Sequence, residues 1–192
     1  MRIKLSIIAV LLLLLTGCSS KSNFYQLHPG TMSSGDHKAS KKGIVIGLGE
    51  IEVPEYLNKP EMVTRLSAGR ITLHDKERWA GSLPKNIQSV LRHSLSAHLP
   101  QYTFLSYPWE EPISDRYRIH VTIERFDGDS AGLVTLEGRW SLVDQEENRV
   151  LFSEPIFYRE QGGITLDAIV DTQSRLLEKL SRHIAGKIRS RI

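Results

Sequence analysis

Two neighbouring stretches of the chain, Arg116–Glu124 (RYRIHVTIE) and Val134–Leu142 (VTLEGRWSL), alternate between apolar or small residues and polar ones. Successive side chains of a β-strand point to opposite faces, so this period of two predicts two strands that bury one face of a sheet. The segment Asp127-Gly128-Asp129 between them is typical of a turn. We therefore expect two consecutive strands, joined by this turn, in a sheet with one buried face.

Weaker strand signals lie on both sides of these two predicted strands. Ile44–Val53 is apolar and rich in β-branched residues, which predicts a buried strand. Met62–Leu66 and Arg70–His74 are separated by a short Ser-Ala-Gly segment and predict a hairpin. Val150–Tyr158 predicts another strand, which we expect Pro155 to interrupt.

Two segments carry apolar residues at helical spacing. Leu83–Leu99 has Pro84 in its first turn and ends before Pro100, and Thr165–Arg189 predicts a longer helix. The order of strands, helix, strands and helix predicts the α/β class. We expect a single compact domain with a mixed, mostly antiparallel sheet packed against two main helices.

Composition excludes several classes of protein and site. A chain of 192 residues with 40% hydrophobic and 24% charged residues is neither disordered nor a polytopic membrane protein. Its net charge of +3 is too small to indicate a nucleic-acid partner. The single cysteine, Cys18, excludes an intramolecular disulfide and a cysteine-rich metal site.

The first 22 residues read as an export signal. A short basic start precedes the apolar run Leu5–Leu15, which is too short to span a bilayer. The run leads into Leu-Thr-Gly-Cys at positions 15–18, which resembles the bacterial lipobox, whose cysteine is acylated and becomes the first residue. An ordinary signal with an unrelated cysteine is the alternative. Ser19 resembles the signal that sorts lipoproteins to the outer membrane.

These features divide the chain into three parts. We expect residues 1–17 to be a signal peptide, 18–23 a lipid-anchored tether, and 24–192 a periplasmic domain with a mobile loop at 28–43. Within that domain, Phe24–Leu27 is expected to pair into the sheet, because two adjacent aromatic residues are costly to leave in water. The domain would then sit close to the membrane.

No sequence pattern points to catalysis. A Gly-x-Ser-x-Gly motif is absent, and Gly47-Leu48-Gly49 lacks the third glycine of a dinucleotide-binding loop. The histidines include no His-x-x-x-His pair, so His28 and His37 are only weak candidates for a metal site. We expect no catalytic residues, no metal and no cofactor other than acyl chains on Cys18.

Two further clusters permit two interpretations each. The basic residues of the last helix form either a solvated face that complements the helix C-terminus or a contact for anionic headgroups or an acidic partner. The aromatic residues between positions 102 and 109 form either a docking edge or part of the core. The residues of these clusters are Arg175, Lys179, Arg182, Lys187, Arg189 and Arg191, and Tyr102, Phe104, Tyr107 and Trp109.

An ordered set of short segments resembles the ABC-type transport auxiliary lipoproteins. The set covers nearly all of the chain after the signal, and its order carries more weight than any one piece. Its members are Cys18, Phe24–Leu27 with Pro29, Val53–Leu57, Arg78-Trp79-Ala80, the helix that ends at Leu99-Pro100, Val121–Gly128 and Gly138-Arg139-Trp140.

The resemblance implies a role and a site. It implies a lipoprotein on the periplasmic face of the outer membrane that serves as a non-catalytic adapter of an MCE-type intermembrane lipid transport system and supports envelope integrity. Its partner would be an MCE-domain protein, with outer-membrane lipid and a second copy of the chain as further candidates. The docking candidates are Pro54, Tyr56, Leu57, Arg78 and Trp79, for which ordinary turns and core packing are the alternative. A lipid-binding shuttle or acceptor with an apolar cavity is the alternative function.

Overall fold

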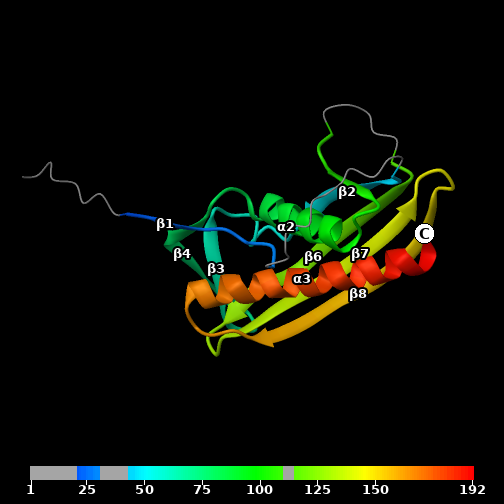
Figure 1. Ribbon diagram of the computed structural model, residues 1–192. Coiled ribbons are helices and arrows are strands. Elements are labelled where there is room, and N and C mark those ends of the chain that lie inside the picture. The colour runs from blue at the N-terminus through cyan, green and yellow to red at the C-terminus, as the bar shows by residue number, and fades with distance from the viewer. Residues whose placement is uncertain (1–20, 31–42, 110–114) are drawn as a thin grey trace, which may run out of the picture.

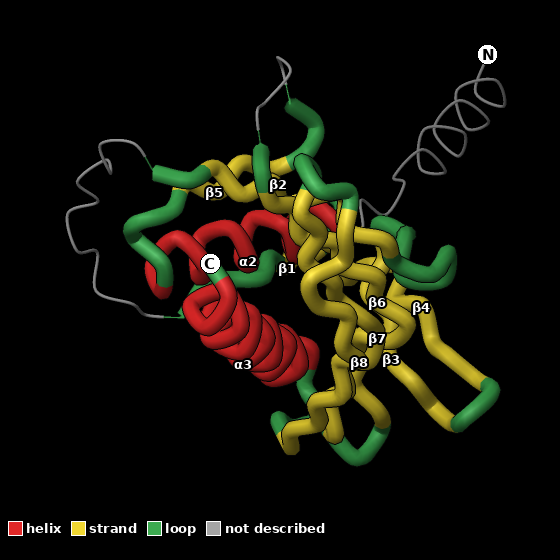
Figure 2. The backbone as a smooth tube through the Cα atoms, turned by 90° about the vertical axis from the view of Figure 1, so that its right-hand side faces the viewer, coloured by secondary structure: helices red, strands yellow, loops and turns green. Residues whose placement is uncertain are grey.

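The computed structural model describes residues 21–30, 43–109 and 115–192, and these form one sheet with two helices on one of its faces (Figures 1 and 2). The α/β class and the single mixed sheet with two helices are confirmed. In chain order the elements are β1 Asn23–Tyr25, β2 Val45–Glu52, β3 Glu61–Ser67, β4 Arg70–Trp79, α2 Leu83–His98, β5 Thr103–Ser106, β6 Tyr117–Asp129, β7 Leu133–Asp144, β8 Arg149–Gln161 and α3 Leu166–Arg191.

The strand β6 is the hub of the sheet. Along one edge it pairs with β7, which pairs with β8, and all three are antiparallel. Along the other edge it pairs with β2 as far as Thr122 and with β3 at Gly128 and Asp129. The strand order β1-β4-β3-β6-β2-β5 follows from this double pairing. The long ladders are antiparallel, while the parallel pairings are short.

Both helices cover the face of the sheet that the alternating pattern marked as apolar. The helix α2 packs on β2 and β5, and α3 crosses β6, β7 and β8 (Figure 2). Thr165 caps α3, because its side-chain oxygen accepts the Ala168 N–H. The packed faces are fully buried, as shown by Ile119, Leu136, Trp140, Leu91, Leu95, Leu177 and Leu180.

The predicted turn at Asp127-Gly128-Asp129 is wrong, because β6 continues through Asp129. A bulge between Ile123 and Arg125 shifts the alternation by one residue, so Gly128 faces α3 and Asp127 faces the other side. A Cβ atom on Gly128 would lie 2.8 Å from Ile169, so glycine permits the close approach of the helix. The chain turns after Asp129, whose carboxylate accepts the backbone N–H groups of the turn that follows.

The expected interruption at Pro155 is also wrong. The strand β8 runs unbroken through this proline, which stands opposite Arg139 of β7. Because β8 pairs with β7 alone among the described strands, one of its edges needs no hydrogen-bond donor. Proline is therefore tolerated inside this strand.

The predicted pairing of Phe24–Leu27 with the sheet is confirmed for Phe24 and Tyr25, since β1 lies parallel to the end of β4 and ends at Tyr25. Leu27 is buried, but Phe24 remains 66% exposed, so the cost of solvating both aromatic residues does not explain the pairing. The backbone of His28 is held against α3, since its N–H donates to Ser174 Oγ. Most of the loop expected at 28–43 lies outside the described residues, and its mobility stays a prediction.

A buried carboxylate joins three segments where β6 changes partner. Asp127 is fully buried and accepts hydrogen bonds from Arg65 of β3, at 2.8 Å, and from Arg125 of β6, also at 2.8 Å. The Tyr56 hydroxyl donates to the same carboxylate from the loop between β2 and β3. Burial, together with the Asp127 charge, raises the pKa of Tyr56 to about 12, so this hydroxyl keeps its proton at neutral pH.

Replacing Asp127 by Asn is expected to lower the free energy of unfolding by about 3 kcal/mol, because two largely buried guanidinium groups lose their counter-charge. Urea unfolding followed by circular dichroism measures this change. Asp75→Asn is the matched control, since Asp75 is exposed and its side chain makes no ion pair among the described residues. A loss below about 1 kcal/mol for Asp127→Asn would show that the network does not hold these segments together.

Candidate functional site

The five predicted docking residues come from two segments that meet at one end of the sheet. Pro54, Tyr56 and Leu57 lie in the loop between β2 and β3, while Arg78 and Trp79 end β4. The loop closes on itself, since the Leu57 N–H donates to the Pro54 carbonyl at 2.9 Å. It is also tied to β4, because the Trp79 N–H donates to the carbonyl of Pro60.

Two of these residues are core side chains. Leu57 is 3% and Trp79 is 5% exposed, and both belong to the main hydrophobic cluster. A docked partner could reach them only after a rearrangement of the loop. Leu57 and Trp79 therefore pack beneath the exposed candidates and hold their backbone in place. Whether the exposed residues dock a partner stays a prediction.

The other three residues keep contact with solvent. Arg78 donates to Glu61 at 3.1 Å, and its side chain is 42% exposed. Pro54 is partly exposed beside a shallow depression at the end of β2. The Tyr56 hydroxyl is held on Asp127 and the Arg65 guanidinium lies over the Tyr56 ring, so this side chain is only partly exposed.

The first described strand lies directly against this surface. Phe24 stands opposite Arg78 and Tyr25 opposite Trp79 in the parallel pairing of β1 with β4. The Ala80 N–H extends the pairing by donating to the Tyr25 carbonyl at 2.7 Å. Cys18 lies outside the described residues, five positions before the start of β1 at Asn23.

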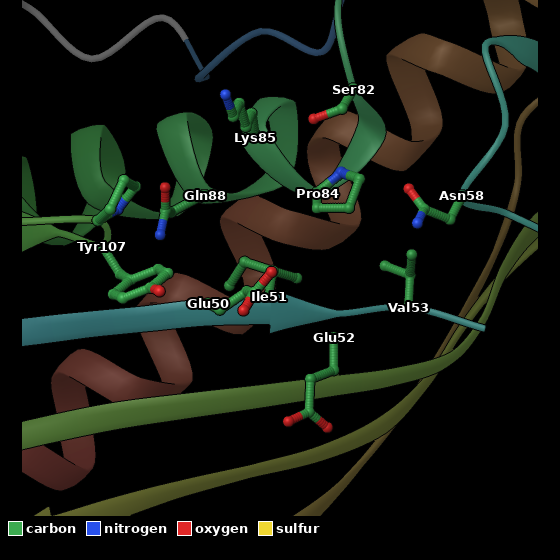
Figure 3. A pocket seen from close by; sticks show the side chains of 11 residues that line it. Glu50, Ile51, Glu52, Val53, Asn58, Ser82, Pro84, Lys85, Gln88 and Tyr107 are labelled. Atoms are coloured by element: carbon green, nitrogen blue, oxygen red, sulfur yellow. The ribbon is translucent and has the colours of Figure 1, made fainter. Parts of the chain in front are cut away.

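A groove that the sequence did not reveal opens beside this surface, between the end of β2 and the first turn of α2 (Figure 3). Its volume is about 430 Å³. Its lining is mixed, with carboxylate, amide, ammonium and aromatic side chains beside apolar ones. The lining includes Glu50, Glu52, Asn58, Lys85, Gln88 and Tyr107. The only sequence signal for it was the pair of glutamates that interrupts the apolar run of β2.

The aromatic residues between positions 102 and 109 divide between the two interpretations. Phe104 is buried in β5, a strand that the sequence did not predict. Tyr107 is 43% exposed and reaches the groove, and its ring meets that of Trp109 edge to face with centroids 5.4 Å apart. The Arg118 guanidinium lies over the Trp109 ring. Core packing therefore accounts for Phe104, while Tyr107 belongs to the surface.

Most basic residues of α3 engage groups within the domain. Arg175 lies 2.6 Å from Glu160, and Lys187 lies 2.5 Å from Glu154. Hydrogen bonds from Lys187 and His183 hold the pKa of Glu154 below its usual value. These contacts favour a solvated, internally paired helix face over a lipid or protein contact.

The described residues bring together no group of three or more histidine, cysteine or acidic side chains that could hold a metal ion. Within the same residues, no helix is both long and apolar enough to cross a bilayer. The ring of His28 instead lies 3.1 Å from Asp171, an exposed pair on the surface of α3.

Comparison with known proteins identifies relatives of this chain. The chain is 29% identical over 164 residues to the intermembrane transport lipoprotein PqiC of Escherichia coli strain K12, covering 84% of this chain and 83% of that protein. The PqiC of Shigella flexneri matches equally.

Two crystal structures share the fold. One, of an uncharacterized protein, has a TM-score of 0.73 at 22% identity and covers 88% of this chain and 99% of that one. The other, from Xanthomonas campestris, has a TM-score of 0.68 at 12% identity, covering 89% and 100%. The model of the ABC-type transport auxiliary lipoprotein component family matches residues 25–185, from β1 into the last turns of α3. This protein therefore belongs to the ABC-type transport auxiliary lipoprotein family.

Proposed function

We propose that this protein is a non-catalytic adapter of an intermembrane lipid transport system, anchored by Cys18 to the periplasmic face of the outer membrane. The family match over residues 25–185 carries the proposal, since it covers almost the whole domain. The relatedness to PqiC supports the intermembrane setting. The partner in this proposal is an MCE-domain protein, which bridges the two membranes, and the complex supports envelope integrity.

The short connection between Cys18 and β1 would keep the domain close to the membrane. Four residues lie between Cys18 and Asn23, so the connection spans at most about 18 Å. Two or more acyl chains give stable attachment to a bilayer. A surface held this close to the membrane meets the end of a bridging partner at a high local concentration, so a weak contact suffices.

The position of the candidate surface agrees with this role. Arg78 lies next to β1 in the sheet, and Pro54 and Tyr56 lie in the loop tied to β4. The buried side chains of Leu57 and Trp79 fix the backbone beneath these groups. Arginine and tyrosine are among the residue types that dominate protein interfaces, and Arg78 and Tyr56 are both partly exposed here.

The alternative function, a shuttle or acceptor that binds lipid in an apolar cavity, has weaker support. The groove beside β2 is open and carries Glu50, Glu52, Lys85 and Gln88. Transfer of an acyl chain into such a site would desolvate charged groups without pairing them. The adapter is therefore the function that we favour.

The anchor is tested by Cys18→Ser, which removes the thiol that would carry the first acyl group. We expect loss of labelled palmitate and accumulation of the unprocessed precursor, measured by metabolic labelling and gel mobility. Ser20→Ala is the matched control and should keep both the label and the processing. Full labelling of the Cys18→Ser chain would contradict the assignment of the anchor.

The docking surface is tested by Arg78→Glu in a pull-down of the lipoprotein from solubilised membranes, read by quantitative mass spectrometry. We expect recovery of the MCE-domain partner to fall about tenfold, because the charge at the surface is reversed. Arg149→Glu is the matched control, since Arg149 also forms an exposed ion pair, with Glu147, but lies in β8.

The two results of this pull-down separate the surface from the function. Equal recovery with both variants would show that the partner binds elsewhere on the domain. Failure of the unaltered lipoprotein to recover any MCE-domain protein would overturn the adapter function itself.

Native mass spectrometry of the purified lipoprotein tests the alternative. We expect covalent acyl chains but no further phospholipid retained under conditions that preserve the fold, because the groove is open and carries charged side chains. A stoichiometric, non-covalent phospholipid would instead favour the shuttle.

A further inference from the structure

The strand β2 has a strand neighbour on both edges over only half of its length. On one edge, β5 pairs with Val45–Leu48 and ends where the Tyr107 N–H donates to the Leu48 carbonyl at 2.9 Å. On the other edge, β6 continues to pair as far as Glu52. Beyond Leu48, therefore, the edge of β2 that faces β5 has no partner strand among the described residues.

The chain beyond β5 does not extend the pairing, because Pro108 follows Tyr107 and has no N–H to donate. From α2, the Gln88 amide donates to the Gly49 carbonyl at 2.9 Å and lies 3.4 Å from that of Leu48. These contacts satisfy the carbonyls next to the end of β5. The segment from Glu50 to Val53 is left to line the open groove.

The groove has the dimensions of a binding site for an extended segment. Four strand residues extend over about 13 Å, and an added strand lies about 4.8 Å from its neighbour. The groove is open to solvent, so its volume of about 430 Å³ would hold only the part of such a segment that lies against β2. Figure 3 shows β2 along one side and the first turn of α2 along the other, with Tyr107 and Asn58 toward opposite ends.

The open edge is acidic. Glu50, Glu52 and the neighbouring Glu124 of β6 are exposed, and none of them forms an ion pair with another described residue. Among the described residues, the hydrogen bond that Glu52 accepts comes from the Thr122 hydroxyl. Partial desolvation, together with the Arg118 charge, holds the pKa of the nearby His120 below its usual value, which reduces the positive charge on that ring at neutral pH. Lys85 lines the groove, but its side chain turns away from β2 (Figure 3).

An unpaired strand edge that lies in a groove and carries uncompensated charge points to one kind of occupant. We propose that the edge Glu50–Val53 is a strand-addition site for an extended segment of a partner protein with lysine or arginine at alternate positions. Main-chain hydrogen bonds to β2 would supply affinity, and the alternate basic side chains would meet the carboxylates. The exposed ring of Tyr107 offers an apolar contact at one end of the segment.

The same carboxylates disfavour pairing of this open edge between two copies of the chain. Two copies joined edge to edge at this segment would place like charges side by side, which disfavours the pairing. A basic segment turns that repulsion into attraction. The carboxylates of Glu50 and Glu52 therefore select a basic segment. The main-chain hydrogen bonds to β2 add affinity but do not depend on the sequence of the segment.

The experiment uses the purified full-length lipoprotein in detergent micelles and a fluorescein-labelled seven-residue peptide in which valine and lysine alternate. Fluorescence anisotropy measures its binding. We expect the Glu50→Lys, Glu52→Lys double variant to weaken binding at least about tenfold, and Asp75→Lys, three strands away on β4, to leave it unchanged. A peptide of alternating valine and glutamate should not bind. If the lysine variant fails to fold, Glu50→Gln with Glu52→Gln removes the charge at nearly constant size.

Two N-methylated peptides separate strand addition from simple charge attraction. Methyl groups on alternate amides block one edge of an extended peptide, and the complementary set blocks the other edge, with the charge unchanged. Only one edge pairs with β2, so one peptide should bind like the parent and the other about tenfold more weakly. Equal binding of both methylated peptides and the parent, or full binding to the double variant, would overturn the proposal.

The proposal rests on the adapter function only in taking a protein as the occupant, and the two can fail separately. If the double variant still recovers the MCE-domain protein from membranes, and the peptide does not bind, the adapter function stands and this edge is not used. If the peptide pairs with the edge but no MCE-domain protein is recovered from membranes, the strand-addition site is supported and the adapter function is contradicted.

Discussion

The buried carboxylate of Asp127 is the interaction on which the architecture depends most. The hub strand β6 must pair with β2 along one part of an edge and with β3 along another, and the loop between β2 and β3 must cross the gap. Asp127 lies at this junction and holds Arg65 of β3, Arg125 of β6 and Tyr56 of the loop. A fully buried charge is stable only when it is paired, so the three segments are kept in one relative position.

After the bulge near Arg125, one face of β6 packs against α3 and the other carries the Asp127 carboxylate. Before the bulge, the apolar face of the strand lies under the helices; after it, Phe126 and Gly128 take over that face and Asp127 turns to the other. One extra residue thus serves both the packing of α3 and the ionic junction. The bulge lies just after the last residues of β6 that pair with β2. At the same level of the sheet, the chain leaves β2 and enters the loop that contains Pro54 and Tyr56.

The candidate recognition features gather where regular pairing stops. The loop after β2 is tied to the end of β4 and, through β1, to the start of the domain. The open half of β2 faces the groove on the adjacent side of this loop. Loops and strand ends can present side chains and unpaired peptide groups, whereas the β6–β7–β8 meander and its helices supply a fixed support.

Local patterns predicted the parts of the chain in which one residue period prevails. The alternation in Tyr117–Ile123 and in Val134–Leu142 specified strands with a buried face, and the helices over 83–98 and 166–191 followed from apolar spacing and terminal residues. The strand β5 was missed because Thr103–Ser106 is short and has little alternation. Trp79 and Leu57 looked like surface anchors because a sequence does not show which aromatic or apolar side chains end in the core.

The sequence by itself determined the fold class, the two helices, the family and the cysteine expected to carry the anchor, since each depends on residues close together in the chain or on their order. Only the tertiary structure decided the role of Asp127, the continuity of β8 through Pro155 and the open edge of β2. The partners of Asp127 are as far as 71 positions away, and whether a strand edge is paired depends on where another strand stops. Such properties arise from contacts between distant segments, which no local pattern encodes.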